Sequence, residues 1–593
     1  MRISLALLRR TCLALLAGVL VCAPAAQAGP SSRGKLDAEL RARAARPQGR
    51  TQVIVRLRSN ADGVSVVRRA KAVAGGRLAL LNAQVAEIDD AALDLLASDA
   101  DVISVHHDRP LVASVDGVSA ASAAGLAGRG LAFDGSGVGV GVIDSGIASH
   151  TDLRDGAKQS RIAGAFDFTG GGSVADEYGH GTHVAGIIAG NGAASKGEYA
   201  GIAPGAHLVS LKVLNAQGRG TVSTAIRAIE YAMAVRRKYK LRVLNLSVGA
   251  AVTESYETDP LTLTARHAVE AGLVVVAAAG NFGKNANGEI QYGGITAPGN
   301  APWVLTVGAY STMGTPMLDD DRVAGYSSRG PTAYDYAAKP DVVAPGTGIV
   351  SLASPASLFY ATKVDYLLGG SLLLSYKPYL SLTGTSMSAP VVSGTVALML
   401  QANPTLTPNM VKAIVQYTAQ RYQGYSSLAQ GAGFLNTRGA VQLARFFRTA
   451  QPGTVMQLPS GWSKQIIWGN HRLSGGAIRP NANAFNRLTT WGAPVDNDGD
   501  AIVWGTLLNA GENLVWGTVD SLNEENLVWG TVLDAAGENL VWGTSVENEN
   551  LVWGTVLDGN GENLVWGTML AGDNLVWGTS NKVTSLSLVG GAL

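Results

Sequence analysis

The sequence predicts an α/β protein built on a doubly wound parallel sheet, with a small α+β unit before it and a region of short repeated β-strands after it. Near-continuous apolar, β-branched runs alternate with helical stretches through the middle of the chain. Such runs are typical of parallel strands that helices cover on both faces. A separate pattern of strands and helices precedes this domain, and one hexapeptide recurs near the C-terminus.

Length and composition fit a globular chain of several domains. The chain has 593 residues, of which 47% are hydrophobic and 15% are charged. The formal net charge of +1 excludes a global field that would favour nucleic acid or a membrane surface, so we expect no nucleic-acid partner. The charge is uneven, because the segment from Asp496 to the end holds fourteen acidic residues and a single basic one, Lys582.

Residues 1–28 have the pattern of a secretory signal peptide. Three arginines precede an apolar stretch over 11–21, and small residues over 26–28 fit a cleavage site. We therefore expect a secreted, extracellular protein, with the periplasm and the cell surface left open as destinations. Both cysteines lie in this segment, so the mature chain is expected to have no disulfide. No other run is long and apolar enough to cross a bilayer, which predicts no transmembrane segment in the mature chain.

A small α+β unit is expected over 51–112. Residues 29–50 before it are rich in arginine and alanine and are interpreted as a poorly ordered leader. The unit has the order β-α-β-β-α-β. Its expected elements are a strand over 53–57, a helix over 64–73, an extended stretch over 78–88, a helix over 91–97 and a strand over 102–105. Small residues over 113–130 predict a flexible processing linker.

The largest domain is expected over 131–445. Its predicted strands are 138–144, 208–214, 241–248, 273–279 and 304–308. Its predicted helices are 180–189, 222–238, 261–272, 386–402 and 408–418. Ligands of parallel sheets bind at the carboxyl ends of the strands. Asp144, Ser247 and Asn281 fall at such ends and are therefore expected to share one site.

The C-terminal region consists of repeats. Residues 446–500 are interpreted as a linker, 501–580 as the repeat region and 581–593 as a tail. Asn-Leu-Val-Trp-Gly-Thr occurs six times, at spacings of 11 to 13 residues, after one degenerate copy over 502–506. One short strand cannot bury its tryptophan alone, so we expect the copies to stack on one another or to pack on the preceding domain.

Three glycine-rich segments supply the groups of a nucleophilic serine site. They are Gly141–Gly146 around Asp144, His180–Gly186, and Gly384–Pro390 around Ser386. A serine hydroxyl becomes a good nucleophile when a neutral imidazole takes its proton and a buried carboxylate orients the imidazole. His183 is expected to be a packed neighbour, because the glutamate of a His-Glu-x-x-His zinc site is missing.

In their order Asp, His, Ser, these three segments resemble the subtilisin-like serine endopeptidases, the subtilases. The resemblance implies a subtilisin-like fold, with Ser386 as nucleophile, His180 as base and Asp144 as its partner. It also implies that Asn281 supplies the oxyanion hole together with the Ser386 N–H. The repeats resemble C-terminal extensions of some bacterial subtilases, and 51–112 resembles the prodomain that acts as an intramolecular inhibitor in this family.

The resemblance further implies polypeptide substrates, bound as an added strand. The residues expected to bind substrate are Gly218, Arg219, Gly220, Ser247, Val248, Gly249, Ala278 and Gly280. Small residues in the first specificity pocket, and Phe282 beside Asn281, favour apolar or aromatic residues before the scissile bond. An insertion over 354–379, relative to compact family members, is expected to shape the cleft.

Catalysis of this kind needs no cofactor. The resemblance implies that Asp152 is a candidate ligand for structural Ca²⁺, although the companion loop over 191–201 departs from the family pattern. A calcium-like segment over 496–500 lacks the glutamate of an EF-hand and is interpreted as an acidic turn.

We therefore predict a secreted serine endopeptidase that processes itself from a pre-pro-protein. Two alternatives remain. One is a catalytically silent protein that binds surfaces through its acidic, tryptophan-rich repeats. The other is a dedicated processing protease with few substrates.

Overall fold

A computed structural model of the chain describes residues 32–115, 131–315, 319–449, 456, 459, 461–469 and 471–474, and three short strands further on. The predicted signal peptide, most of the processing linker and most of the repeat region lie outside the described residues. Within the described part of the chain, no helix has both the length and the apolar character needed to span a membrane.

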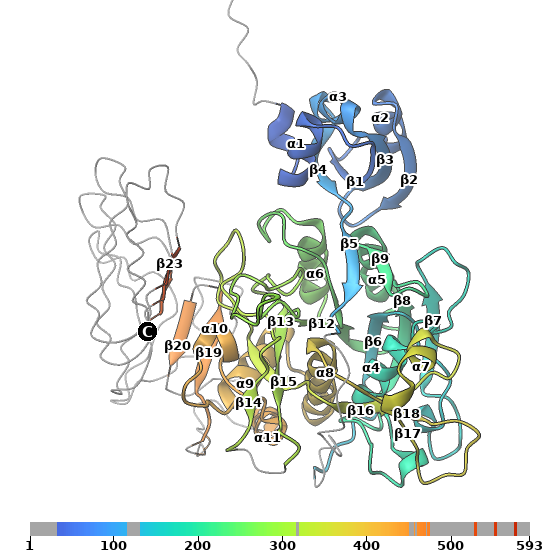
Figure 1. The fold of residues 1–593 in the computed structure, drawn as a ribbon, viewed down its shortest axis with the longest axis vertical. Coiled ribbons are helices and arrows are strands. Elements are labelled where there is room, and N and C mark those ends of the chain that lie inside the picture. The colour runs from blue at the N-terminus through green and yellow to red at the C-terminus, as the bar shows by residue number, and fades with distance from the viewer. Residues whose placement is uncertain are drawn as a thin grey trace, which may run out of the picture.

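The N-terminal unit is a four-stranded antiparallel sheet with helices, drawn in blue in Figure 1. Its strands lie in the order β2-β3-β1-β4. The strands are β1 (Arg50–Leu57), β2 (Val73–Leu78), β3 (Ala83–Asp89) and β4 (Val102–His107). The helices are α1 (Ala38–Ala45), α2 (Gly63–Arg69) and α3 (Leu93–Ser98), with single 3-10 turns at Ser32–Lys35 and Asp90–Ala92. From β1 onward the order is the predicted β-α-β-β-α-β.

The structure corrects three details of this part of the chain. The helix expected over 64–73 ends at Arg69, because Val73 already begins β2, and a turn divides the extended stretch over 78–88. The segment 29–50, expected to be poorly ordered, contains α1, whose Leu40 is fully buried in the core of the unit. Burial of one apolar face orders a helix that its arginine-rich composition does not suggest.

The large domain is centred on a mainly parallel sheet in the order β14-β13-β12-β10-β6-β8-β7, with β15 beside β13. Only β14 runs antiparallel to its neighbour. The strands are β6 (Gly139–Asp144), β7 (Ile162–Asp167), β8 (His207–Lys212), β10 (Leu241–Leu246), β12 (Val274–Ala278), β13 (Leu305–Ser311), β14 (Arg322–Val323) and β15 (Val342–Pro345). The five predicted strands are all present. The half-exposed edge strand β7 was not predicted, because one-sided burial leaves no continuous apolar run.

Helices of this domain include α4 (His180–Ala189), α5 (Val222–Val235), α6 (Pro260–Glu270), α8 (Thr385–Ala402), α9 (Pro408–Thr418), α10 (Ser427–Gln430) and α11 (Thr437–Thr449), with 3-10 turns at Thr151–Leu153 and Ala193–Ser195. Five of them, α4, α5, α6, α8 and α9, pack against this sheet at the predicted places, whereas α10 and α11 were not predicted, and α11 packs on α8 and α9. The domain boundary expected at 445 lies inside α11, whose Phe447 is buried in the main core.

Two small sheets border the carboxyl ends of the central strands. In the first, β5 (Pro110–Ala113) lies between β11 (Val248–Gly249) and β9 (Arg219–Thr221). Figure 1 shows β5 running from the blue N-terminal unit into the large domain. The second sheet comprises β16 (Ile349–Leu352), β17 (Leu367–Leu368) and β18 (Tyr379–Leu382), near α7 (Leu358–Thr362) and a 3-10 turn at Val364–Tyr366. It flanks the insertion over 354–379, which contributes β17 and the first residue of β18.

The segment after α11 is not wholly a linker. Strands β19 (Gln465–Trp468) and β20 (His471–Ser474) form an antiparallel hairpin. Trp462, Ile466 and Trp468 belong to the main core, which corrects the linker expected over 446–500. Ile467 donates its N–H to the side chain of Gln416 and accepts from it, so the hairpin is hydrogen-bonded to α9.

Three copies of the hexapeptide form a parallel, in-register sheet. Its strands are β21 (Leu527–Trp529), β22 (Leu551–Trp553) and β23 (Leu575–Trp577). Equivalent residues pair with one another, so Trp553 lies opposite both Trp529 and Trp577. The three described copies therefore pair side by side in one sheet, and each begins 24 residues after the previous one.

Candidate active site

The end of β6 and the start of α4 hold the first two residues of the site. Asp144 is the last residue of β6 and His180 is the first of α4, and both are fully buried. The Nδ1 atom of His180 lies 2.7 Å from Oδ1 of Asp144. The same oxygen accepts the Ser145 N–H at 2.8 Å. Because an ionised carboxylate only accepts hydrogen bonds, Nδ1 carries the proton and Nε2 keeps the lone pair that a general base needs.

A second buried carboxylate, that of Asp176, joins these two elements. One oxygen accepts the Ser145 hydroxyl and the Gly179 N–H, both at 2.7 Å. The other accepts the N–H and the hydroxyl of Thr182 at 2.8 and 2.6 Å. Burial raises the pKa of Asp176, and these hydrogen bonds oppose the rise. Asp176 thus orients the start of α4, where the N-cap residue, Gly179, has no side chain. The sequence analysis did not identify this residue.

Ser386 is the second residue of α8 and is fully buried. Its hydroxyl donates a hydrogen bond to the carbonyl oxygen of Ser247 at 2.7 Å. The Nε2 atom of His180 has no hydrogen-bond partner among the described residues. Since α4 packs against α8, the predicted base and nucleophile lie on neighbouring elements. Hydrogen bonds between catalytic groups often form only in the reacting complex, and in this structure the Ser386 hydroxyl is bonded to Ser247 instead of to His180.

A carbonyl oxygen of the chain itself lies between the predicted oxyanion donors. The Ser114 oxygen accepts a hydrogen bond from Asn281 Nδ2 at 2.7 Å and one from the Ser386 N–H at 3.2 Å. The amide of Asn281 is oriented by Thr385, whose N–H and hydroxyl donate to Oδ1 at 3.0 and 2.9 Å. Two fixed donors on one carbonyl oxygen form the geometry that stabilises an oxyanion.

Strand β5 leads to that carbonyl through both predicted edge segments. Val112 and Ala113 pair with Gly249 and Val248, and Leu111 and Val112 pair with Gly220 and Arg219 on the other side. The Ser114 N–H donates to the Ser247 carbonyl oxygen at 3.2 Å. The Arg219 residue is exposed, as expected for an arginine on the rim of a cleft. Gly218 lies beside these strands with φ +72°, and a side chain there would clash with the ring of Tyr178.

The residues expected to wall the first pocket lie beside this strand end. Ala278 ends β12 and is buried. Gly280 has φ +104° and donates its N–H to the Thr385 hydroxyl at 3.2 Å. Ser114 is itself only 8% exposed. The sequence favours an apolar or aromatic residue at this position, whereas the chain's own segment has a serine.

Two aromatic rings flank His180. Tyr178 and Phe359 pack at 4.4 Å between ring centroids, and each lies 6.4 Å from the His180 ring. Phe359 comes from α7, so the insertion does border the cleft, as predicted. The sequence gives no local signal for this aromatic pair, because its members are separated by 180 residues of chain.

His183 is a packed residue, as expected. Its Nε2 donates to the carbonyl oxygens of Leu380 and Ile349 at 2.9 and 3.1 Å. Burial lowers the pKa of His183 to about 3. The imidazole is therefore neutral over the ordinary pH range and acts as a hydrogen-bond donor between α4 and the small sheet.

The surroundings of Asp152 do not fit a calcium ligand. Its carboxylate accepts the Ala194 N–H at 2.8 Å and the Tyr379 hydroxyl at 2.7 Å. Its carbonyl oxygen accepts the guanidinium of Arg161 at 2.7 Å. Calcium needs six to eight oxygen ligands, whereas the loop over 191–201 presents an N–H group to Asp152. The candidate calcium site is thus corrected to a buried carboxylate held by protein donors.

Comparison with known proteins agrees with this geometry. The profile of the subtilase family, Peptidase_S8, matches residues 135–434. Serine protease AprX of Bacillus subtilis is 37% identical over 369 residues, which are 61% of this chain and 79% of that protein. Subtilisin DY of Bacillus licheniformis is 33% identical over 312 residues, or 52% and 93% of the two chains.

A solved structure shows the same fold. The crystal structure of fervidolysin from Fervidobacterium pennivorans, described as a keratinolytic enzyme related to subtilisin, matches with a TM-score of 0.52 and 20% identity. The match covers 69% of this chain and 62% of that one.

Proposed function

Since the chain belongs to the subtilase family of serine proteases, we propose that it is a secreted endopeptidase whose precursor cleaves itself between Ser114 and Val115. The observation that carries the proposal is the Ser114 carbonyl oxygen, which accepts hydrogen bonds from Asn281 and from the Ser386 N–H. In this proposal the signal peptide over 1–28 directs export, and the N-terminal unit is the prodomain.

The reaction uses the groups around that carbonyl. Nε2 of His180 takes the proton of Ser386 as its oxygen attacks the carbonyl carbon of Ser114, and Asp144 stabilises the imidazolium. Asn281 and the Ser386 N–H hold the oxyanion. His180 then gives the proton to the nitrogen of Val115, which leaves as the peptide bond breaks. Water attacks the acyl-enzyme with His180 as base and frees the new carboxyl group of Ser114.

After cleavage the prodomain remains bound as an inhibitor. Its strand β5 keeps the pairing that a substrate would use. The carboxylate of Asp108 accepts the N–H and hydroxyl of Ser223, at the start of α5, at 2.8 and 2.7 Å. The guanidinium of Arg109 pairs with Asp259 at 2.5 Å, and both are buried. These contacts support tight binding until the prodomain is itself degraded.

Polypeptides bind to the mature enzyme as an added strand between β9 and β11. Leu111 is fully buried, whereas Val112 is 45% exposed. In a bound substrate the scissile carbonyl takes the place of that of Ser114. We therefore expect the enzyme to select an apolar side chain at the place of Leu111 and to accept varied side chains at the place of Val112.

Wild type and Ser386→Ala, expressed as full chains, test this proposal. We expect wild type to yield a product that begins at Val115 and digests casein, and the variant to remain uncut and inactive. Intact masses and N-terminal sequencing give the readout. A first cut elsewhere, or cleavage of Ser386→Ala at the same bond, would contradict the assignment.

The same experiment separates the alternative functions. If both proteins stay intact and inert, the silent surface-binding alternative replaces this one. A peptide library then distinguishes a digestive from a processing enzyme, since broad acceptance indicates digestion and one long, strict motif indicates dedicated processing.

A further inference from the structure

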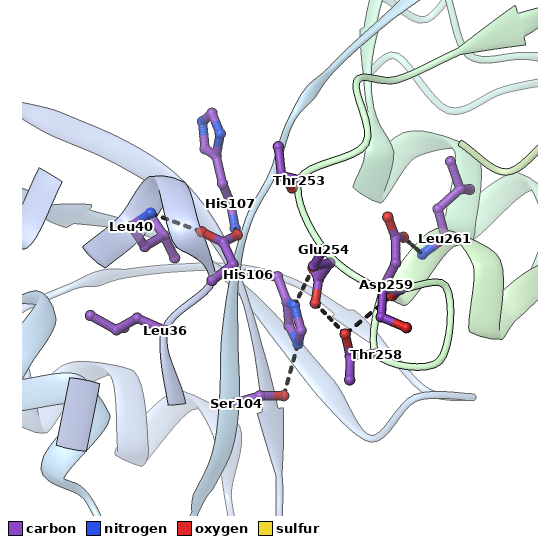
Figure 2. Close-up of polar contacts among 12 residues, drawn as sticks. Leu36, Leu40, Ser104, His106, His107, Thr253, Glu254, Thr258, Asp259 and Leu261 are labelled. Carbon is purple, nitrogen blue, oxygen red and sulfur yellow. Dashed lines mark hydrogen bonds and ion pairs between the residues drawn. The ribbon is translucent and has the colours of Figure 1, made fainter. Parts of the chain in front are cut away.

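A polar cluster connects the prodomain to the peptidase domain away from the triad. Asp37 precedes α1, His106 lies in β4, and Glu254 lies in the peptidase loop between β11 and α6. One nitrogen of His106 and one carboxylate oxygen from each of the others all lie within 4.8 Å of one another. Figure 2 shows His106 pointing from the prodomain toward Glu254, and its Nδ1 lies 2.7 Å from Oε1.

The cluster is buried and carries excess negative charge. Asp37 is 7% and His106 3% exposed, and the Glu254 side chain is 13% exposed. The nearby Arg109 forms its direct ion pair with Asp259 and also attracts Glu254 and Asp37, so one guanidinium is shared among three carboxylates. Two carboxylates close together in a buried interface are unfavourable unless a cation compensates for them.

Each of the three side chains is held by a further hydrogen bond. Asp37 accepts the N–H groups of Leu40 and His107 at 2.8 and 2.6 Å. Nε2 of His106 lies 2.8 Å from the Ser104 hydroxyl, and Oε2 of Glu254 accepts the Thr258 hydroxyl at 2.7 Å. Such outer partners are typical of metal ligands, because they orient each donor atom before the ion arrives.

We propose that Asp37, His106 and Glu254 bind one divalent transition-metal ion, for which Zn²⁺ is the best chemical match. One imidazole nitrogen and two carboxylate oxygens are ligands that Zn²⁺ accepts, with water as the fourth. Calcium and magnesium prefer oxygen ligands alone. The ion would replace the hydrogen bond between His106 and Glu254 and neutralise the carboxylates.

The site is complete only while the prodomain is docked, because two ligands belong to the prodomain and one to the peptidase domain. An ion that binds only the docked state stabilises that state. Zinc is therefore expected to retain the prodomain after cleavage, which makes release of activity dependent on free zinc. This consequence rests on the proposed function, whereas binding of the ion does not.

Calorimetric titration of ZnCl₂ into the metal-free, full-length Ser386→Ala chain tests the site. We expect one bound ion per chain. Mutation of a residue that supports a metal ligand weakens metal binding by roughly 10–100-fold. Glu254→Gln and His106→Gln, each added to Ser386→Ala, remove a ligand itself and should weaken zinc binding at least as much. Glu254→Gln keeps the size and polarity of the side chain. Because Glu254 lies outside the prodomain, this substitution should leave the folding of the prodomain unchanged.

Two matched controls should leave zinc binding unchanged. His107→Gln removes the neighbouring imidazole, and His267→Gln removes the histidine of an exposed pair with Glu270. The proposal is wrong if the chain takes up no zinc, if Glu254→Gln binds as tightly as its parent, or if a control variant loses the ion.

A second measurement uses the active chain. Zinc should delay the appearance of casein hydrolysis in wild type, and this delay should disappear in Glu254→Gln. An equal delay in wild type and in Glu254→Gln would mean that zinc acts at another site. This result would contradict retention of the prodomain by zinc at Glu254. If self-cleavage fails while Ser386→Ala still binds zinc at these residues, the proposed function falls and the metal site stands.

Discussion

The Ser386 hydroxyl donates to the Ser247 carbonyl oxygen, while Nε2 of His180 has no partner among the described residues. The proton on Nδ1 of His180 is held by Asp144, so the lone pair of Nε2 remains available. At the residue scale, the proposed reaction therefore requires the Ser386 hydroxyl to leave the Ser247 carbonyl oxygen and turn toward His180. The Ser114 carbonyl, which the proposal assigns as the scissile one, already accepts hydrogen bonds from both donors.

Asn281→Ala removes one of those donors. We expect kcat to fall by about 10²–10³ with little change in KM, because the amide acts mainly on the charged intermediate; this range itself derives from a subtilisin. Steady-state hydrolysis of a peptide substrate by the mature enzyme provides the test. A rise in KM at unchanged kcat would instead assign Asn281 to ground-state binding.

The buried His183 side chain leads us to predict a pH dependence of the free energy of unfolding. Burial lowers its pKa to about 3 in the folded chain, against about 6.5 when unfolded. Between these values the unfolded chain binds the extra proton, so stability is lost as the pH falls from about 6.5 toward 3, by about 1.4 kcal/mol per pH unit from this group. His183→Gln in the Ser386→Ala chain should flatten that slope. Urea unfolding between pH 4 and 7 measures it, and identical slopes would contradict the assignment.

The hydrogen bonds of Asp152 predict how calcium removal affects thermal stability. Its carboxylate is already satisfied by Ala194 and Tyr379. We therefore expect EGTA to leave the Tm of the processed peptidase domain unchanged, whereas Tyr379→Phe should lower it because a buried carboxylate loses a donor. Differential scanning calorimetry gives both values. A fall in Tm with EGTA that added Ca²⁺ reverses would show that calcium binds elsewhere in the domain.

At the scale of elements, β5 occupies the place of a substrate strand in the proposed function. Its pairing on both sides fixes the register that places Ser114 at the oxyanion donors. Register matters because a shift by one residue reverses which side chains are buried. The buried Leu111 and the exposed Val112 are therefore expected to contribute differently to binding.

Leu111→Ala and Val112→Ala form a matched pair. Loss of a buried leucine side chain costs about 2 kcal/mol or more, which corresponds to a prodomain inhibitor weaker by about thirtyfold or more. Val112→Ala should change inhibition little, since Val112 is 45% exposed. Inhibition constants of the two cleaved prodomains against the mature enzyme measure the difference. Equal losses would mean that the strand backbone, rather than Leu111, determines affinity.

At the scale of the whole molecule, the C-terminal repeats stack among themselves in the described copies. The paired strands begin at Leu527, Leu551 and Leu575, and one further copy of the hexapeptide stands between each pair. The structural period is therefore two copies, although the sequence repeats at every copy.

Two deletions test this period. Removing 551–574 deletes one full period and should keep the tail folded, whereas removing 556–568 deletes a single copy and should disrupt the pairing. Thermal unfolding followed by tryptophan emission reports on the tail, since most of the eleven tryptophans lie there. If both deletions unfold alike, the copies do not pair with a two-copy period.

The sequence by itself determined the triad candidates, the five central strands and the helices between them. These follow from local rules, because apolar periodicity reports which residues are buried and glycine-rich motifs report where backbone must come close. It also predicted the order of elements in the prodomain. It missed α1 and the hairpin after α11, whose apolar residues are too few to stand out without their partners.

Only the tertiary structure decided which carbonyl of the chain meets Asn281, which rings flank His180, and that Asp152 is held by Tyr379. It alone brought Asp37, His106 and Glu254 together. Most of these contacts join residues far apart in the chain, such as Ser114 and Asn281, 167 positions apart, and Asp152 and Tyr379, 227 positions apart. Local pattern does not encode such pairings, because they depend on the register of strands and on how packed elements meet in three dimensions.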